Sequence, residues 1–573
     1  MRTRIRWIQS PTIAFLGVIL GGVVWEIPSI AQTLETRNYS LQNGSDRGSL
    51  AQIMAEDLED PEEEKPEQTP EEQYIPVNQA LIQDIKVVGS TVFSTSIFDA
   101  IVSPYEGKEL TIDQLKELIE AVTQLYLNEG YYTSRAVYPQ QSLDEGILTI
   151  EIQERQAIVQ VEWLNENRLS DRYISDRIPA VSPLNVPAIE DQLRVLRDDP
   201  HLASVAATLR RDDQAAADTL VVQAEEKRNF YGEFTTDNFS SPSLGGERLG
   251  VTFGLRNLSG FGDGISANYN ASTTGGYHSL DLNYAAPLNA QNGTLQLRGS
   301  FDFSKVTGGE FEALNLRGER SRYEVSYRHP IRKTSLEEFA LSGAFIYTTG
   351  TTFAFGTPTP FGFGANADGT TRTAIVRLSQ EYLRRDKWGA WVGSSNFNFG
   401  LGLLDATENK KPTPDSQFFS WLGQFQRVQR LSDRQILLAQ LDLQLSPNTL
   451  LPSDQFTIGG GQSIRGYRQN ALIADNGFRF SVEDRITVRR DAAGLPTLQF
   501  APFLDVGAAI NTKNNPNSLS QNQNVLAGIG LGILWDPRPD LSIRLDYGYP
   551  LVDIEAGDNI QDHGLYFNSS LKF

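Results

Sequence analysis

Apolar and polar residues alternate along much of the C-terminal half of the chain, most clearly at its end. In residues 565–573 every second residue falls on a mostly apolar face, and the chain ends on the aromatic Phe573. A strand has this pattern when one face meets lipid and the other meets a water-filled lumen. The apolar face holds Leu565, Phe567, Ser569, Leu571 and Phe573, and the polar face holds Tyr566, Asn568, Ser570 and Lys572.

The same period of two recurs from about residue 229 onward, where helical patterns disappear. Gly- and Asn-rich turns separate the alternating runs, and several runs finish with an aromatic residue. At about 10 residues per strand plus turns and long loops, this span accommodates about 14 to 18 strands, and we expect sixteen. A large soluble β-sandwich or β-helix explains neither the terminal aromatic nor such sustained alternation. The sequence therefore predicts a mainly β fold with an antiparallel transmembrane β-barrel at 228–573.

The region before the barrel has a different sequence pattern, in which short strands and helices are mixed. A strand is expected at 82–88, a short helix at 95–102, and strands at 131–138 and 147–152. Between them, Thr111 followed by Gln114 is typical of a capping box that opens a helix, and Gly130 is a natural C-terminal stop. Its apolar stripe consists of Leu115, Leu118, Ile119, Val122 and Leu125.

This order recurs more weakly in the next 75 residues or so. Strands are expected at 158–163, 205–210 and 219–224, and helices at 170–177 and 187–196, the last with Pro187 at its first position. The order of the elements resembles the POTRA (polypeptide-transport-associated) repeats that precede certain barrels. We therefore expect two small α+β domains, POTRA 1 at 77–154 and POTRA 2 at 155–227.

The N-terminus has the pattern of an export signal at 1–31. Arg2, Arg4 and Arg6 precede a short apolar run at 13–24, and small residues end at Ala31. The alternative is an N-terminal membrane anchor, but the run falls short of the ~20 residues that a spanning helix needs. After Ala31 no segment approaches that length.

Residues 32–76 form an N-terminal segment and a linker. Ten acidic residues against the single Lys65 in 56–72, with three prolines, predict an extended, solvated stretch. Just before it, apolar residues at helical spacing in 50–58 indicate either a short amphipathic helix or a disordered tail.

The amino-acid composition limits which kinds of catalytic site, metal site and partner the chain can have. The chain contains no cysteine, which excludes thiolate catalysis and cysteine metal sites, and its four histidines show no ligand spacing. A net charge of −21 argues against nucleic acid as a partner. No Ser/His/Asp arrangement is evident. We expect no cofactor, no metal and no enzymatic activity.

One stretch interrupts the barrel pattern: 450–467, rich in Gly and Pro, between two strong strand runs. It predicts a long loop with Arg465 at a tight turn. An exposed hairpin with an incidental arginine is the plain alternative. A phosphate-binding loop is disfavoured, because no Lys-Ser/Thr follows and no helix opens behind it, so no nucleotide is expected.

This stretch resembles the sixth extracellular loop of the Omp85 superfamily, whose tip carries Val/Ile-Arg-Gly-Tyr/Phe, as in Ile464 to Tyr467 here. Forty residues on, 503–507 (Phe-Leu-Asp-Val-Gly) is similar to that superfamily's inward-facing Phe-x-Asp-x-Gly strand. The resemblance implies that the loop folds into the barrel and that Arg465 pairs with Asp505. It further implies that Gly466 lets the tip turn and that Tyr467 packs against the wall. The supporting positions are Gly459, Gly460, Phe503 and Gly507.

Within that superfamily, two modules and a length under 600 residues resemble the TpsB transporters of two-partner secretion, the haemolysin and haemagglutinin exporters of the ShlB/FhaC/HecB type. The resemblance covers about residues 77–573. Members of this branch carry a plug helix before the linker, for which 50–58 is the candidate.

The resemblance implies an outer-membrane pore, with its POTRA domains in the periplasm, that exports an unfolded client of haemagglutinin or haemolysin type. Whether export also activates the client stays open. Other partners implied are outer-membrane lipid and, during biogenesis, the barrel-assembly machinery. Alternatives are an Omp85-type factor that inserts other barrels and a passive porin. Client contacts are expected at Leu115, Leu118, Val122, Tyr126, Tyr131 and Tyr132, and the assembly signal at Phe567, Leu571 and Phe573.

Overall fold

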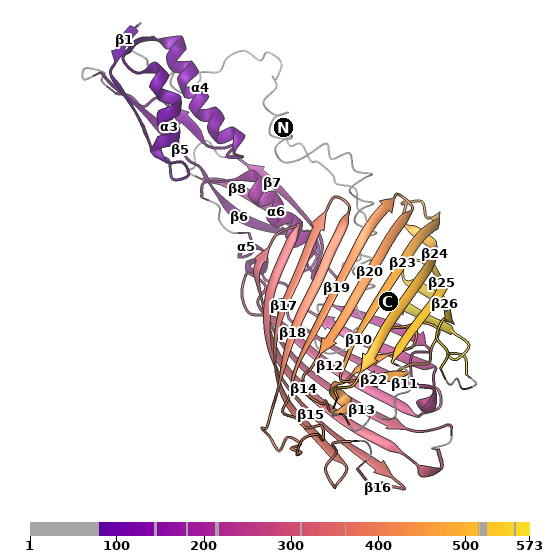
Figure 1. The fold of residues 1–573 in the computed structure, drawn as a ribbon. Helices are drawn as coiled ribbons and strands as arrows, with labels where there is room; N and C mark the ends of the chain where they lie inside the picture. Colours follow the sequence, from indigo (N-terminus) through magenta and orange to yellow (C-terminus); the bar gives the residue numbers. More distant parts are fainter. Residues whose placement is uncertain are drawn as a thin grey trace. The chain divides into compact units, whose positions relative to one another are not determined.

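The computed structural model describes residues 79–141, 146–178, 182–211, 217–309, 312–360, 363–513, 515, 524–554, 557 and 559–573 (Figure 1). The predicted export signal, the 50–58 helix and the acidic linker lie outside these residues. The described chain forms two units, one up to Glu226 and one from Lys227 to Phe573. Within the described ranges, no helix combines the length and apolar character that crossing a membrane requires.

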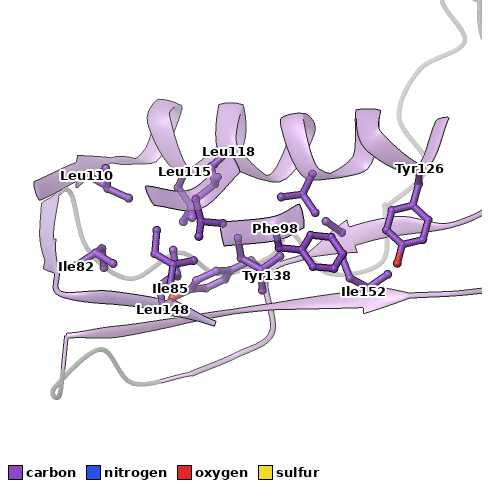
Figure 2. Close-up of a cluster of buried hydrophobic side chains, with 14 residues drawn as sticks. Ile82, Ile85, Phe98, Leu110, Leu115, Leu118, Tyr126, Tyr138, Leu148 and Ile152 are labelled. Carbon is purple, nitrogen blue, oxygen red and sulfur yellow. The ribbon is translucent and has the colours of Figure 1, made fainter. Parts of the chain in front are cut away.

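The first module places two helices on a three-stranded sheet whose central strand is β5. Strand β2 runs parallel to β5 and β4 runs antiparallel to it, while β1 pairs with β3. Figure 2 shows the helices and the sheet closing over one apolar core. The elements are β1 (Gln79–Ile82), β2 (Asp84–Val88), α3 (Thr95–Val102), η1 (Ser103–Tyr105), β3 (Lys108–Thr111), α4 (Ile112–Asn128), β4 (Arg135–Val137) and β5 (Ile147–Gln153).

Helix α4 starts as the sequence predicts. The Thr111 hydroxyl accepts the backbone N–H of Gln114, and the Gln114 side chain accepts the N–H of Thr111, so the capping box is confirmed. The prediction of a strand at 131–138 is wrong in its length, because the strand found there, β4, covers Arg135–Val137. The chain turns directly after Gly130, with the Ser134 N–H bonded to the Tyr131 carbonyl, and leaves three residues for β4.

The apolar face of α4 is core, which corrects one prediction. Leu115, Leu118, Val122 and Tyr126 are buried against the sheet and do not form an exposed client surface; Tyr131 and Tyr132 are half-buried. The Tyr126 hydroxyl lies 2.6 Å from the Ser90 hydroxyl and 2.8 Å from the Glu154 carboxylate, and burial raises the pKa of this phenol above its usual range. The stripe holds the module together because its own sheet covers it.

The second module repeats this layout around the central strand β8. Strand β6 is parallel to β8 and β7 is antiparallel. Helix α6 is capped by the Asn185 side chain and starts at Val186, one residue before the proline that was expected to open it. The elements are β6 (Gln156–Trp163), α5 (Asp171–Ser175), α6 (Val186–Arg197), β7 (Leu202–Arg210) and β8 (Ala217–Glu226).

The second unit is a closed antiparallel barrel of sixteen strands, which confirms the predicted count. A two-residue piece, β16 (Thr357–Pro358), extends the hairpin of β15 and β17. The strands are β9 (Phe230–Asp237), β10 (Arg248–Arg256), β11 (Gly264–Ser272), β12 (Tyr277–Pro287), β13 (Thr294–Lys305), β14 (Arg317–Lys333), β15 (Glu337–Ala354), β17 (Thr370–Asp386), β18 (Gly389–Leu401), β19 (Phe419–Ser432), β20 (Gln435–Leu445), β23 (Asn476–Arg490), β24 (Pro496–Ile510), β25 (Val525–Arg538), β26 (Leu541–Pro550) and β27 (Leu565–Lys572). Short 3-10 turns are η2 (Pro242–Leu244), η3 (Glu312–Leu314) and η4 (Pro452–Asp454).

The two faces of the strands differ as the alternation predicts. Leu378, Phe425 and Leu531 are exposed on the outer face. On the inner face Arg328 bonds Glu338 (2.6 Å) and Glu381 (2.7 Å). The barrel therefore presents an apolar outside and a polar, charge-paired lumen.

The barrel closes between its first and last strands. β27 pairs with β9 over five residue pairs, a shorter ladder than β27 forms with β26. Phe573 extends it, because its N–H and C=O bond the backbone of Gly232 at 3.0 and 2.9 Å. The Phe573 ring lies among Phe230, Phe234 and Phe253, with ring centroids 5.5 to 6.3 Å away. The terminal aromatic thus covers the seam from outside.

Candidate functional site

The loop of residues 446–475, between β20 and β23, packs against the inner wall of the barrel. It contains the hairpin of β21 (Phe456–Ile458) and β22 (Leu472–Ala474). Ile464 and Tyr467 are buried with Ala509 on β24 and Leu526 on β25, both on the inner face. The loop turns at Gly459, Gly460 and Gly466, which have φ of 107°, 105° and 105°, a conformation that favours glycine.

Arg465 at the loop tip meets Asp505 on β24. Its Nε and Nη2 donate to the two carboxylate oxygens at 2.7 and 2.9 Å, and its backbone N–H donates to the same group at 3.1 Å. Arg465 is 5% exposed and Asp505 is fully buried. A planar fork on a buried carboxylate fixes both distance and orientation.

Aromatic and small groups complete this pair. The Phe503 ring lies under the Arg465 guanidinium, 3.3 Å from its central carbon to the ring centroid. The Ser481 hydroxyl donates to Asp505 at 2.6 Å. A Cβ at Gly507 would stand 3.1 Å from the Ile464 side chain, so the loop lies close to the wall here. Residues Ile464, Phe503 and Gly507 therefore share one site with the ion pair.

The cluster extends beyond the motif residues. Arg465 also donates to Glu483 on β23 (2.7 Å), which binds Arg544 (2.6 Å) and Arg485 (2.9 Å). Arg544 in turn binds Asp546 at 2.7 Å. Three arginines thus face three carboxylates, Glu483, Asp505 and Asp546. Such mutual compensation is what buried charges require.

Four residues of the cluster were not predicted from the sequence: Glu483, Arg485, Arg544 and Asp546. Ser481, Glu483 and Arg485 alternate along β23 on the inner face, as do Arg544 and Asp546 along β26. This periodicity was the available signal, but it does not reveal which strands become neighbours of the loop.

The backbone of the tip is held by the last strand. The Gly466 N–H donates to the Tyr566 hydroxyl (2.9 Å), which donates to the Tyr467 carbonyl (2.6 Å). The Tyr467 hydroxyl lies 2.7 Å from the carbonyl oxygen of Ala527 and 2.9 Å from that of Val552. Tyr566, on the inner face of β27, was also missed as a site residue.

Glycines in two strands allow this close approach. A Cβ at Gly548 on β26 would stand 2.7 Å from the Arg465 carbonyl carbon, and one at Gly466 would stand 3.0 Å from the Pro550 nitrogen. A Cβ at Gly528 on β25 would also overlap the Arg465 backbone. Glycine inside a strand often marks such a contact.

The remaining predicted residues lie elsewhere. Phe567 and Leu571 face the opposite side of β27 from Tyr566, together with Phe573. The six expected client residues belong to the first module. Within the described ranges, no group of three or more His, Cys, Asp or Glu side chains is arranged to hold a metal ion.

Removing the Tyr566 hydroxyl is expected to loosen the loop tip. In Tyr566→Phe the Gly466 N–H and the Tyr467 carbonyl both lose a partner, at a cost of about 1 to 3 kcal/mol. We expect secretion to fall several-fold while the amount of heat-modifiable barrel stays normal. Tyr547→Phe, on the outer face of β26, is the matched control. Wild-type secretion by Tyr566→Phe would contradict this role.

Comparison with known proteins identifies two regions. The family described as haemolysin secretion/activation protein ShlB/FhaC/HecB matches residues 218–534. The POTRA domain of ShlB type matches residues 80–154.

Similar curated proteins cover most of the chain. The outer membrane transporter CdiB of Dickeya dadantii (strain 3937) is 24% identical over 490 residues, which is 82% of each chain. The heme/hemopexin transporter protein HuxB of Haemophilus influenzae (strain 86-028NP) is 21% identical over 475 residues, covering 79% of this chain and 80% of HuxB.

Solved structures share the fold. CdiB from Escherichia coli has a TM-score of 0.68 at 19% identity, covering 96% of this chain and all of CdiB. BamA from Haemophilus ducreyi lacking POTRA domains 1–3 has a TM-score of 0.53 at 13% identity, covering 86% and 100%. Because the family match spans more than half of the sequence, the chain belongs to the haemolysin secretion/activation (ShlB/FhaC/HecB) family of outer-membrane transporters, with its barrel in the outer membrane and its POTRA modules in the periplasm.

Proposed function

We propose that this transporter exports one dedicated client protein, unfolded, from the periplasm through the barrel lumen to the cell surface or medium. The observation that carries the proposal is the loop tip fastened inside the barrel by Arg465, with Asp505 and Glu483 as its partners. A loop that a buried charge cluster fixes inside the lumen can set the opening through which an extended client passes. The client class that we propose is the haemolysin and haemagglutinin type, and the protein acts without enzymatic chemistry, cofactor or nucleotide.

Client capture is proposed to occur at the edge strands of the periplasmic sheets. β2 and β4 flank β5 in the first module, and β6 and β7 flank β8 in the second. Val88 on β2 and Ile158 on β6 are exposed. An unfolded chain can add to such an edge through main-chain hydrogen bonds, which gives generic affinity, while neighbouring pockets select side chains. Tyr131 and Tyr132 remain candidate contacts beside the edge strand β4.

The loop is proposed to hold the lumen in an arrangement that can conduct the client. The loop tip keeps one position because Arg465 is there paired with opposite charges and makes hydrogen bonds of good geometry. Client folding outside the cell would make passage effectively one-way.

Photo-crosslinking tests whether the client passes through the lumen. A photoreactive residue at Gln424, which faces the lumen and contacts Asp442, is expected to crosslink to a client arrested during export. The neighbouring position Phe425 faces lipid and serves as the matched control. Equal crosslinking at both positions, or none at Gln424 with an arrested client present, would contradict passage through the lumen.

A further inference from the structure

A second carboxylate, Asp475, sits at the base of the same loop, just before β23. It is fully buried. One of its oxygens accepts the backbone N–H of Leu450 (2.9 Å) and the amide of Gln455 (3.0 Å). The other accepts the N–H and hydroxyl of Thr512 (both 2.8 Å) and the amide of Asn515 (2.9 Å). Among the described ion pairs, none involves Asp475.

These donors join three parts of the chain. Leu450 and Gln455 belong to the part of the loop that follows β20. Asp475 is the last loop residue before β23, and Thr512 follows β24. One carboxylate thus closes the loop at its base and ties it to the strand that carries Asp505. Buried polar groups of this kind specify one arrangement when every member is satisfied.

Neighbouring contacts strengthen the same junction. The Gln444 amide donates to the carbonyls of Asp454 and Asp475 at 3.0 and 3.1 Å. The Ser446 N–H donates to Asn476 at 2.6 Å, and the Thr449 and Thr512 hydroxyls lie 3.0 Å apart.

The loop therefore has polar contacts with β24 at its tip and with the residues directly after β24 at its base. Thr512 and Asp505 are seven residues apart, which is about 23 Å of extended chain. Contacts at both places fix the direction of the loop segment that contains Leu450 and Gln455, whereas the tip contact alone would let that segment shift relative to β24. Gly459 and Gly460 allow the chain to bend between them.

We propose that Asp475 is a positioning residue: it fixes the base of the loop so that Arg465 reaches Asp505. The expected effect of Asp475 on export rests on the proposed function of the Arg465 anchor. The expected effect of Asp475 on loop position does not depend on that function.

Loop position is measured directly by pulsed EPR, which is clean because the chain has no native cysteine. One spin label is placed at Asn470→Cys, which is exposed on the loop, and the other at Lys387→Cys, which is exposed in the β17–β18 turn. The distance between the two labels measures the position of the loop relative to the barrel. We expect one narrow distance distribution in the parent and a broad one in Asp475→Ala. Asp491→Ala, which removes a carboxylate that accepts N–H groups in the turn after β23, is the control and should stay narrow.

Export is measured as the amount of secreted client, which is first identified as the protein lost from the medium when the gene is deleted. Asp475→Ala should lower secretion about tenfold with normal barrel levels. The double variant with Arg465→Ala should be no worse than Arg465→Ala alone, because both act through the same contact. A disulfide from Thr449→Cys with Thr512→Cys should restore secretion in Asp475→Ala, and a reductant should remove the rescue; the same cysteines with Asp475 intact are the control.

Unchanged distances in Asp475→Ala, or multiplied defects in the double variant, would overturn the inference. So would loss of the assembled barrel that the disulfide does not rescue. Normal secretion by Arg465→Ala together with broadened distances in Asp475→Ala would instead refute the anchor function and leave the positioning role standing.

Discussion

Arg465→Ala is expected to leave a membrane-inserted barrel and to lower client secretion by more than about tenfold. The substitution removes the cation between Asp505 and Glu483, which are both buried. An uncompensated buried carboxylate costs about 3 kcal/mol or more, so the loop tip should leave its place. The sixteen strands do not depend on this contact for their pairing. Secretion per unit of heat-modifiable barrel is the quantity to measure.

Two variants make this test specific. Arg465→Lys keeps the charge but loses the two-pronged contact with Asp505, and an intermediate loss is expected. Arg328→Ala removes another lumenal arginine that also binds two carboxylates, Glu338 and Glu381, but is not on the loop. Equal losses in Arg328→Ala and Arg465→Ala would show that lumenal charge in general, rather than the loop anchor, governs export.

Deleting Phe573 is expected to reduce the amount of assembled barrel several-fold. The deletion removes two backbone hydrogen bonds to Gly232 and the ring that covers Phe230, Phe234 and Phe253 at the seam. The closing ladder between β27 and β9 is short, so each end contact matters. Heat-modifiable barrel in outer-membrane fractions measures the effect, and unchanged levels would contradict it.

Gly232→Val separates seam packing from recognition of the C-terminus by the assembly machinery. A Cβ at Gly232 would overlap the Phe573 ring, while the terminal sequence stays intact. If packing at the seam matters, Gly232→Val lowers assembly as the deletion does. If the terminal residue acts solely as a recognition signal, Gly232→Val assembles normally. Val251→Ala, on the neighbouring strand β10, is the control for a mild substitution near the seam.

The barrel could be predicted from sequence because each strand reports its own two faces. Period-two alternation is local, and a span of known length then sets the strand number. The Arg465 and Asp505 contact is present in the structure, but it was expected from a resemblance to known motifs and not from spacing.

The rest of the site depends on strand neighbours that no local pattern reveals. Glu483, Arg544 and Tyr566 lie up to about 80 residues apart in sequence, and their inner faces surround the loop tip because β23 to β27 form one curved wall. The α4 stripe was misassigned to the client for a related reason: amphipathic spacing shows that a face is covered, without showing by what.

Deletion of the gene, followed by quantitative proteomics of medium and outer membrane, tests whether this transporter serves a dedicated client. We predict the loss of one or a few large secreted proteins, with the other outer-membrane barrels unchanged. Broad depletion of barrels from the membrane would refute a dedicated client and would indicate an assembly factor instead.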